Sequence, residues 1–172
     1  MTDCGEQIFR SWVETNVRAG LELAEASDLL SLVPVGATRL IAHFEGPCLT
    51  RGAAGAVDVA HGFDVGIRLP RGFLADPHAH ESSQLVCYLG PHDNVFHPNI
   101  RGHAICMNVG GPTHLLPRLL HAIWDLFLGV HSSADPLDPD AAAWYREHPE
   151  RFPLSRTPLK RRRLEIRVAR KS

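Results

Sequence analysis

The sequence predicts an α+β fold in which a helix, an antiparallel sheet, a loop and two more helices follow one another along the chain. Apolar residues recur at steps of three and four near the N-terminus and again after residue 115, which is the helical period. Over residues 57–69, apolar and polar residues alternate, as in a strand with one buried face. Such elements pack as helices against one face of a sheet. We expect one domain over residues 1–154 and a basic tail over residues 155–172.

The N-terminal helix is expected over residues 5–26. Its apolar stripe consists of Ile8, Phe9, Trp12, Val13, Val17, Gly20, Leu21, Leu23 and Ala24. The opposite face carries charges that alternate in sign every four residues: Glu6, Arg10, Glu14, Arg18 and Glu22. Opposite charges at this spacing stabilise an exposed helix by roughly 0.2–0.5 kcal/mol per pair.

Four strands are expected next, over residues 29–35, 39–45, 57–69 and 84–89. The third has the clearest alternation, which indicates an antiparallel sheet with one buried and one wet face. His61 falls on the inward-facing positions of that strand. We therefore expect it to be a hydrogen-bonded core residue rather than a ligand.

Two helices are expected after residue 115. The first is strongly apolar, runs from about Leu116 to Leu128 and ends at Gly129, a residue typical of helix C-termini. The second begins after Asp138, which is a favourable N-cap and precedes a proline at the first helical position. We expect this helix to continue to about His148.

Composition excludes several classes of protein. No apolar run approaches the roughly 20 residues that span a bilayer, and the N-terminus lacks the apolar core of a signal peptide. The cysteines Cys4, Cys48, Cys87 and Cys106 show no C-x-x-C spacing, so the sequence predicts reduced thiols rather than a disulfide framework or a zinc site. We therefore expect a cytoplasmic protein with no membrane partner.

The net charge of −1 hides an asymmetry between the tail and the rest of the chain. Residues 156–172 contain eight basic residues and one acidic residue, a balance of +7, so the other 155 residues carry −8. A basic tail binds nucleic acid when aromatic residues are interleaved with the charges, and this tail has none. We expect a solvated extension and no nucleic-acid partner.

The segment with most functional information is the run Phe96-His97-Pro98-Asn99-Ile100, followed seven positions after Asn99 by Cys106. A reactive cysteine needs a rigid loop, partial exposure of its sulfur and a polar group that stabilises a developing oxyanion. The turn-forming His-Pro-Asn can supply the rigid loop, and Asn99 can supply the polar group. Downstream, residues 134–142 read Ala-Asp-Pro-Leu-Asp-Pro-Asp-Ala-Ala and are followed by Tyr145.

In residues 96–152 the chain resembles the E2 ubiquitin-conjugating enzymes, whose active site has His-Pro-Asn before the thioester-forming cysteine and an Asp-Pro-Leu-x-Pro run after it. The resemblance implies a UBC-like fold and a thioester between Cys106 and a ubiquitin-like modifier. It also implies an activating enzyme (E1) and a protein substrate as partners, with transfer of the modifier to a substrate lysine. The chain has no G-x-x-x-x-G-K-[ST] loop, so adenylation belongs to another protein, and no cofactor is expected.

The resemblance also implies roles for single residues. Asn99 would donate a hydrogen bond either to the oxyanion or to the loop backbone, and the sequence leaves both partners open. Asp135 would orient the incoming lysine or lower its pKa, with a helix-initiating turn as its alternative role. His97 and Pro98 are expected to support the active-site loop structurally.

Some segments depart from the family. The Trp-Ser-Pro loop that many members present to RING-type ligases is replaced by Gly110-Gly111-Pro112-Thr113, and the other ligase-facing loop reads Arg71-Gly72-Phe73-Leu74. We therefore do not expect dependence on a RING-type ligase. This divergence resembles the E2-like proteins of bacterial ubiquitin-like conjugation systems, some of which belong to antiphage defence operons.

Two other readings stay open, and a third, a metal site, is not expected. Cys106 with His103, His114 or His131 as base would make a Cys-His hydrolase. An E2-like module that only binds ubiquitin-like proteins is the non-enzymatic reading, although such modules typically lack the cysteine. The run His78-Ala79-His80-Glu81, with His92 and His97, has no second ligand cluster at a recognisable interval, so we expect no metal site.

Overall fold

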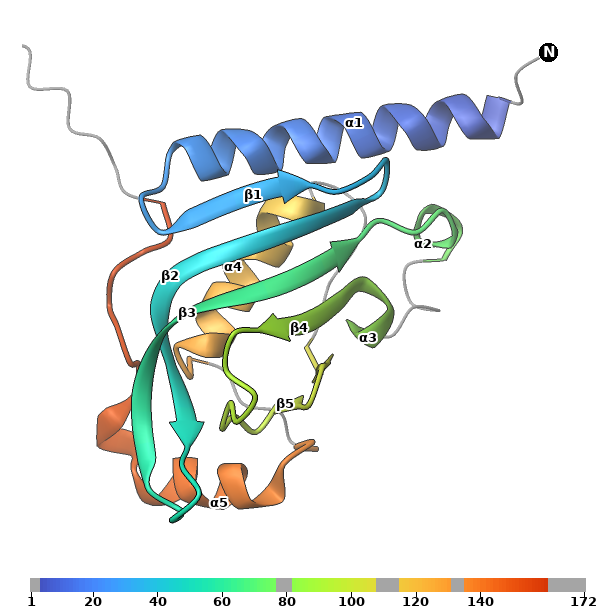
Figure 1. Ribbon diagram of the computed structural model, residues 1–172. Coiled ribbons are helices and arrows are strands. Elements are labelled where there is room, and N and C mark those ends of the chain that lie inside the picture. Colours follow the sequence, from blue (N-terminus) through green and yellow to red (C-terminus); the bar gives the residue numbers. More distant parts are fainter. Residues whose placement is uncertain (1–3, 77–81, 108–114, 131–134, 161–172) are drawn as a thin grey trace, which may run out of the picture.

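A computed structural model describes residues 4–76, 82–107, 115–130 and 135–160. It has an α+β architecture: the long helix α1, an antiparallel sheet of six strands in the order β1-β2-β3-β4-β6-β5, and further helices after the sheet (Figure 1). The helices are α1 (Cys4–Glu25), α2 (Gly72–Ala75), α3 (Ser82–Leu85), α4 (Leu115–Phe127), α5 (Pro139–Glu147) and the 3-10 turn Pro149–Arg151. The strands are β1 (Leu30–Pro34), β2 (Arg39–Arg51), β3 (Val57–Arg68), β4 (Val86–Gly90), β5 (Ile100–Arg101) and β6 (Ala104–Ile105).

The sheet contains six strands, so the prediction of four was wrong in number. The predicted strands correspond to β1–β4, and β2 continues to Arg51, six residues beyond its expected end at residue 45. The two extra strands, β5 and β6, have two residues each and lie in the loop after β4. A strand of two residues has no alternation to detect, which is why the sequence pattern did not reveal them.

The prediction for His61 was also wrong, because this residue is exposed. Between Phe44 and Pro47 the register of β2 against β3 shifts, which leaves one extra residue on β2. Gly62, opposite this irregularity, has a φ of +79°. A bulge re-aims the side chains on one side of it, so the alternation that buries Phe63 does not continue to His61.

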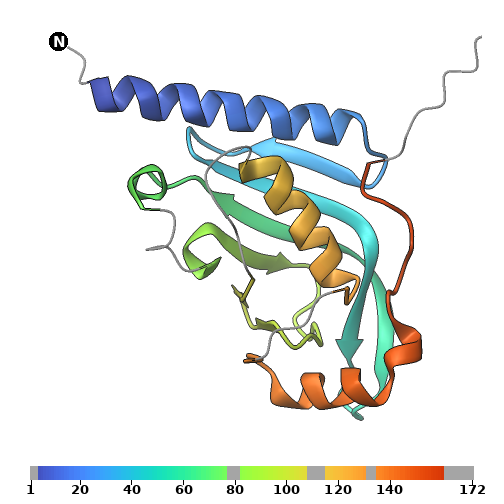
Figure 2. The same ribbon diagram turned by 180° about the vertical axis from the view of Figure 1, so that it is seen from behind.

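The core lies between the sheet and α4, which crosses one face of the sheet (Figure 2). Phe127 of α4 stacks on Phe63 with ring centroids 3.7 Å apart, and Phe63 stacks in turn on Phe44 at 4.9 Å. Helix α1 packs beside α4 and β1. Gly20 allows the close approach, because a Cβ there would lie 2.6 Å from a methyl carbon of Leu116.

A buried polar residue joins α1 to α4. Asn16, which is 3% exposed, accepts a hydrogen bond from the backbone N–H of Leu116 (3.1 Å) and donates one to the Trp12 carbonyl (2.9 Å). The first N–H groups of a helix have no partner within it. Asn16 therefore satisfies an otherwise orphaned donor in the first turn of α4.

Both predicted helix ends are confirmed. Gly129 has a φ of +74° after α4, and the N–H groups of Gly129 and Val130 donate to the carbonyls of Leu126 and Asp125. This is the Schellman pattern. At the start of α5, the Asp138 side chain accepts a hydrogen bond from the Ala141 N–H (3.0 Å).

Two other features differ from expectation. Of the pairs that the charge ladder on α1 allows, the described structure contains one, Arg10–Glu6 (3.0 Å). Residues 155–160, which the sequence assigned to the tail, contact the domain: Leu159 is 1% exposed and its carbonyl accepts a hydrogen bond from the Ser27 hydroxyl. None of the described helices has the length and apolar character that crossing a bilayer requires.

Candidate active site

The His-Pro-Asn segment forms a buried turn at the end of the long β2–β3 ribbon. The Ile100 N–H donates to the His97 carbonyl (3.1 Å), which closes a four-residue turn with Pro98 at its second position, where φ is pre-set. One residue earlier, the Phe96 N–H donates to the Leu49 carbonyl of β2 (2.8 Å). The turn is thus tethered to the sheet and preorganised by its own sequence.

His97 braces this turn and is 2% exposed. Its Nδ1 accepts a hydrogen bond from the Asn99 N–H (3.0 Å), and its Nε2 donates to the Leu126 carbonyl at the end of α4 (2.8 Å). Burial lowers the pKa of His97 to about 4, because desolvation outweighs the opposing effect of the Leu126 carbonyl. The ring is therefore neutral at pH 7, and both nitrogens are engaged by the backbone. His97 thus holds the turn through hydrogen bonds to backbone groups.

A short hairpin explains the seven-position spacing between Asn99 and Cys106. β5 and β6 pair with Ile100 opposite Ile105 and Arg101 opposite Ala104, so the turn between them has two residues, Gly102 and His103. Gly102 has a φ of +57°, which such turns require and glycine permits. Continuing the same register by one pair brings Asn99 opposite Cys106.

Two hydrogen bonds join this outer pair. The Cys106 N–H donates to the Asn99 carbonyl (2.8 Å), and the Asn99 side-chain amide donates to the Cys106 carbonyl (3.0 Å). The Asn99 backbone N–H does not complete the ladder, because it donates to His97. The Asn99 side-chain amide instead donates to the Cys106 carbonyl, the acceptor that the backbone N–H would use in a regular ladder. The sequence left open whether this amide donates to the oxyanion or to the loop backbone. In the structure it donates to the loop backbone.

Cys106 differs from the other cysteines in its surroundings. It is a free, half-buried thiol directly after β6, and its sulfur makes no hydrogen bond within the described residues. Cys48 is 1% exposed, and burial raises the pKa of its thiol to about 11. Cys4 is exposed at the start of α1, and Cys87 lies half-buried on β4. Cys106 alone combines partial exposure with a hydrogen-bonded loop.

The segment that contains Asp135 adjoins the same turn. The Asp138 N–H donates to the Pro98 carbonyl (3.1 Å), so the start of α5 is fixed to the His-Pro-Asn turn. Asp135 lies three residues before this contact and is exposed. The structure therefore joins the two sequence motifs, through backbone groups that no side-chain pattern would reveal.

Tyr145 is a member of the site that the sequence reasoning named only by resemblance. Its ring packs edge-on against the His97 ring, with centroids 5.3 Å apart, and on the Phe152 ring at 4.1 Å. Burial raises the pKa of the Tyr145 hydroxyl, which has no hydrogen-bond partner among the described residues. Sequence reasoning missed the Leu126 carbonyl, the acceptor for His97, because a backbone group gives no signal of its own.

The histidines of the hydrolase reading are only partly described. The His103 Nδ1–H donates to the Tyr88 carbonyl (2.7 Å), which fastens the β5–β6 turn to β4. His114 and His131 lie outside the described residues, as do His78–Glu81 and the segment 110–113. Within the described part of the chain, no group of three or more His, Cys, Asp or Glu residues is arranged to hold a metal ion.

Neither a protein-family model nor a curated protein matches this chain. The geometry around Cys106 and the sequence motifs are therefore the features that indicate a function.

Proposed function

We propose that this protein is an E2-like conjugating enzyme with a UBC-like fold. It would accept a ubiquitin-like modifier from an activating enzyme as a thioester on Cys106 and transfer it to a lysine of a protein substrate. The α+β architecture, with an N-terminal helix and an antiparallel sheet, is compatible with that fold. The bacterial conjugation systems, including antiphage defence, are the setting we propose for it.

The observation that supports this proposal best is the pairing of Asn99 with Cys106 across the hairpin. Its two hydrogen bonds fix the backbone from which the Cys106 sulfur projects, while His97 fixes the backbone of Asn99. A preorganised nucleophile loses little entropy when it reacts. The sulfur lacks a hydrogen-bonded base in the described structure, as suits a thiol that exchanges acyl groups rather than one activated for hydrolysis.

The proposed chemistry is two acyl transfers. In the first, the Cys106 thiolate attacks the thioester that joins the modifier to the activating enzyme, and that enzyme's cysteine leaves as a thiolate. In the second, a neutral lysine amine attacks the Cys106 thioester, the tetrahedral intermediate expels the Cys106 thiolate, and the amine's extra proton passes to solvent. Asp135, exposed three residues before the contact between Asp138 and the turn, is suited to attract the amine as it arrives.

The surface around α2 supports independence from RING-type ligases. Phe73, the aromatic residue in the segment that corresponds to a ligase-facing loop, is fully buried. Its ring stacks on Trp12 of α1 with centroids 6.2 Å apart. An aromatic side chain that is part of the core is not available to a ligase.

Incubation with the cognate activating enzyme, modifier and ATP, followed by a non-reducing gel, tests the proposal. The wild-type chain should gain one modifier, and the adduct should disappear with thiol reductant. Cys106→Ala should abolish it, and the matched variants Cys48→Ala and Cys87→Ala should not. If no adduct forms but the modifier still binds, the non-catalytic binding module is the correct reading.

The same reagents distinguish a hydrolase. A Cys-His hydrolase needs no ATP or activating enzyme, and replacing its base with Gln would cost at least about 100-fold in rate. We expect His103→Gln to charge and discharge at the wild-type rate, since its ring is anchored to β4. Cleavage of a modifier-linked peptide by this chain alone would contradict the proposal.

A further inference from the structure

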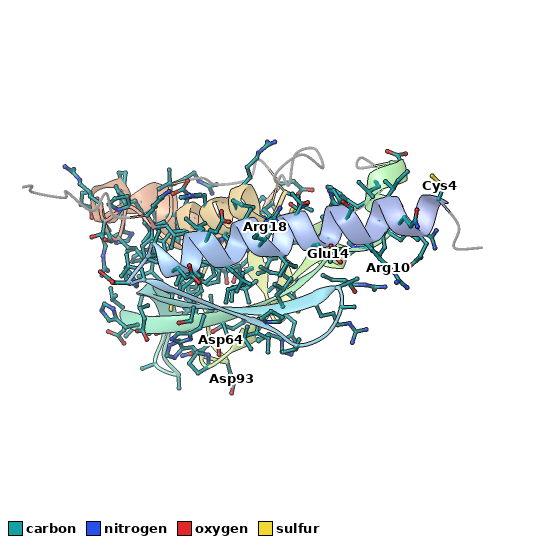
Figure 3. The ribbon with its side chains drawn as sticks, turned by 90° about the horizontal axis from the view of Figure 1, so that it is seen from above. Cys4, Arg10, Glu14, Arg18, Asp64 and Asp93 are labelled. Atoms are coloured by element: carbon teal, nitrogen blue, oxygen red, sulfur yellow. The ribbon has the colours of Figure 1, made fainter. Side chains whose placement is uncertain are left out.

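The sheet has a second face, turned away from α4, that no other described element covers. Figure 3 shows Asp64 and Asp93 projecting on this side. We call it the outer face and define it by the positions of β2 and β3 that alternate with the buried core: Arg39, Ile41 and His43 on β2, and Asp64, Gly66 and Arg68 on β3. These six residues form three cross-strand pairs, which are Arg39–Arg68, Ile41–Gly66 and His43–Asp64.

One end of the outer face is positive. Arg39 and Arg68 lie directly opposite each other, are exposed, and make no ion pair with any described residue. Like charges placed opposite across two strands are destabilising. A negative group from outside the chain would relieve this repulsion.

The other end is negative. His43 contacts Asp64 through Nδ1 (2.5 Å) and Glu45 through Nε2 (3.0 Å), and these carboxylates raise its pKa. Asp93 lies on the same side of the sheet as Asp64 (Figure 3). Because two carboxylates contact one imidazole, this end stays negative even when His43 is protonated.

The middle of the outer face is apolar and hollow. A hollow of about 610 Å³ lies beside Gly66, with Ile41, Cys87 and Leu89 among its lining residues. The Cys87 sulfur occupies the space above Gly66, since a Cβ there would lie 2.8 Å from it. Val33, which pairs with Ile41, is 54% exposed, and Leu89 is 46% exposed. Clusters of large exposed apolar residues mark interaction surfaces.

We propose that a second copy of this chain covers the outer face and forms a twofold-symmetric dimer. The axis lies in the interface, across the strands, at the level of Ile41 and Gly66. The positive pair and the negative pair each lie two residues from this level, on opposite sides of it. Rotation about the axis therefore places the positive end of one copy against the negative end of the other. Arg68 then faces Asp64 of the second copy, and Arg39 faces His43 and Glu45.

The charge pattern selects this axis. The charged pairs of one copy are about 13 Å apart along the strands, too far to contact each other within the chain. An axis parallel to the strands would instead stack arginine on arginine. A twofold interface must be complementary to itself, and a face that is positive at one end, apolar in the middle and negative at the other satisfies that condition. The pattern favours a copy of the chain over an unrelated partner.

Sedimentation of the full chain over a range of concentrations, at low and high salt, tests the dimer. The monomer mass is 19.0 kDa. The wild type should dimerise, and salt should weaken the dimer. Arg68→Asp and Asp64→Arg should each weaken self-association at least about tenfold, because each brings like charges together twice.

Mixing the two variants gives the decisive result. One copy then has two acidic residues and the other two arginines, so both contacts across the axis are attractive, and a heterodimer should form at wild-type strength. If Asp64→Arg lowers the melting temperature, Arg39→Glu mixed with Glu45→Arg replaces the pair. A monomeric wild type at all concentrations, or no heterodimer from the mixed variants, overturns the proposal.

Discussion

At the scale of single residues, His97 determines whether the turn beside Cys106 keeps its shape. Protonation would give Nδ1 a hydrogen, and the Asn99 N–H would then lose its acceptor. The folded pKa of His97 is about 4, below the ordinary value of 6.5. Between these values the unfolded chain binds more protons, so His97 contributes stability that is complete above pH 6.5 and declines as the pH falls toward 4.

The first prediction concerns this pH dependence. A shift of this size corresponds to roughly 3 kcal/mol of free energy of unfolding, lost between pH 6.5 and 4. His97→Asn keeps an acceptor for the Asn99 N–H and removes the titration. The stability difference between wild type and His97→Asn, measured by urea unfolding at several pH values, should therefore shrink as the pH falls. A constant difference would contradict the assignment.

His43 supplies a matched control, because its pKa is shifted in the opposite direction from that of His97. Its pKa is raised by Asp64 and Glu45, so its contribution to stability is complete below pH 6.5 and declines as the pH rises through its folded pKa. The stability lost in His43→Asn should therefore be larger at pH 5 than at pH 9.

The second prediction separates charging of Cys106 from discharge. Asn99→Ala removes the amide that donates to the Cys106 carbonyl. The variant should still accept the modifier, because the activating enzyme directs that step, but it should discharge slowly onto free lysine. Loss of an oxyanion donor costs about 100- to 1,000-fold, which is an upper limit here. Single-turnover discharge measures it, with Asn94→Ala as the control, because the Asn94 amide donates to Arg51 instead.

Asp135→Ala gives the third prediction, with Asp140→Ala as an exposed acidic control. If the carboxylate helps to deprotonate or attract the amine, the variant should discharge more slowly at pH 7. The difference should narrow toward pH 10, where the lysine amine is largely deprotonated. A wild-type rate for both Asn99→Ala and Asp135→Ala would leave Cys106 as the only catalytic residue of the proposal.

The sequence motifs predicted which residues belong together, but not how they are held. Seven positions between Asn99 and Cys106 result from a hairpin with a two-residue turn, whose strands are too short for any periodic pattern. His97 acts through the Leu126 and Asn99 backbones, and Asp138 through the Pro98 carbonyl. Backbone partners are decided by tertiary structure, and a one-dimensional pattern carries no information about them.

At the scale of elements, the joint between α1 and α4 depends on a polar residue in an apolar stripe. Asn16 lies on the buried face of α1, and its Oδ1 accepts the Leu116 N–H from the first turn of α4. The fourth prediction is that Asn16→Ala lowers the free energy of unfolding by about 1–3 kcal/mol, since it leaves a buried donor unsatisfied. Thr15→Ala, at an exposed position one residue earlier, should change it by less than about 0.5 kcal/mol. If both variants lowered the free energy of unfolding equally, the hydrogen bond between Asn16 and Leu116 would contribute nothing to stability.

The helix ends and the long strands could be predicted because their signals are local. Gly129 and Asp138 act within one turn of their own helices, and Phe63 alternates with polar neighbours along β3. The prediction failed for His61, where an extra residue on β2 shifts the register of the two strands. A bulge in one strand depends on its partner, so β3 alone gave no warning.

At the scale of the whole molecule, the proposed active site and the proposed dimer interface lie on separate surfaces. The Cys106 hairpin pairs at the edge of the sheet, beyond β4, and the start of α5 is bonded to the His-Pro-Asn turn beside it. The outer face instead centres on β2 and β3, and its hollow extends to Cys87 and Leu89 of β4. Dimerisation through that face would leave Cys106 accessible, so the charge-reversal variants should retain charging.

The central claim is that Cys106 carries the modifier as a thioester, and intact-mass spectrometry of Cys106→Ser tests it most directly. Serine at this position should form an oxyester more slowly, because its hydroxyl is a weaker nucleophile than a thiolate. The wild-type adduct should vanish on treatment with thiol reductant, and the serine adduct should persist. An unchanged, reductant-sensitive adduct on Cys106→Ser would mean that another cysteine carries the modifier, and it would contradict the account.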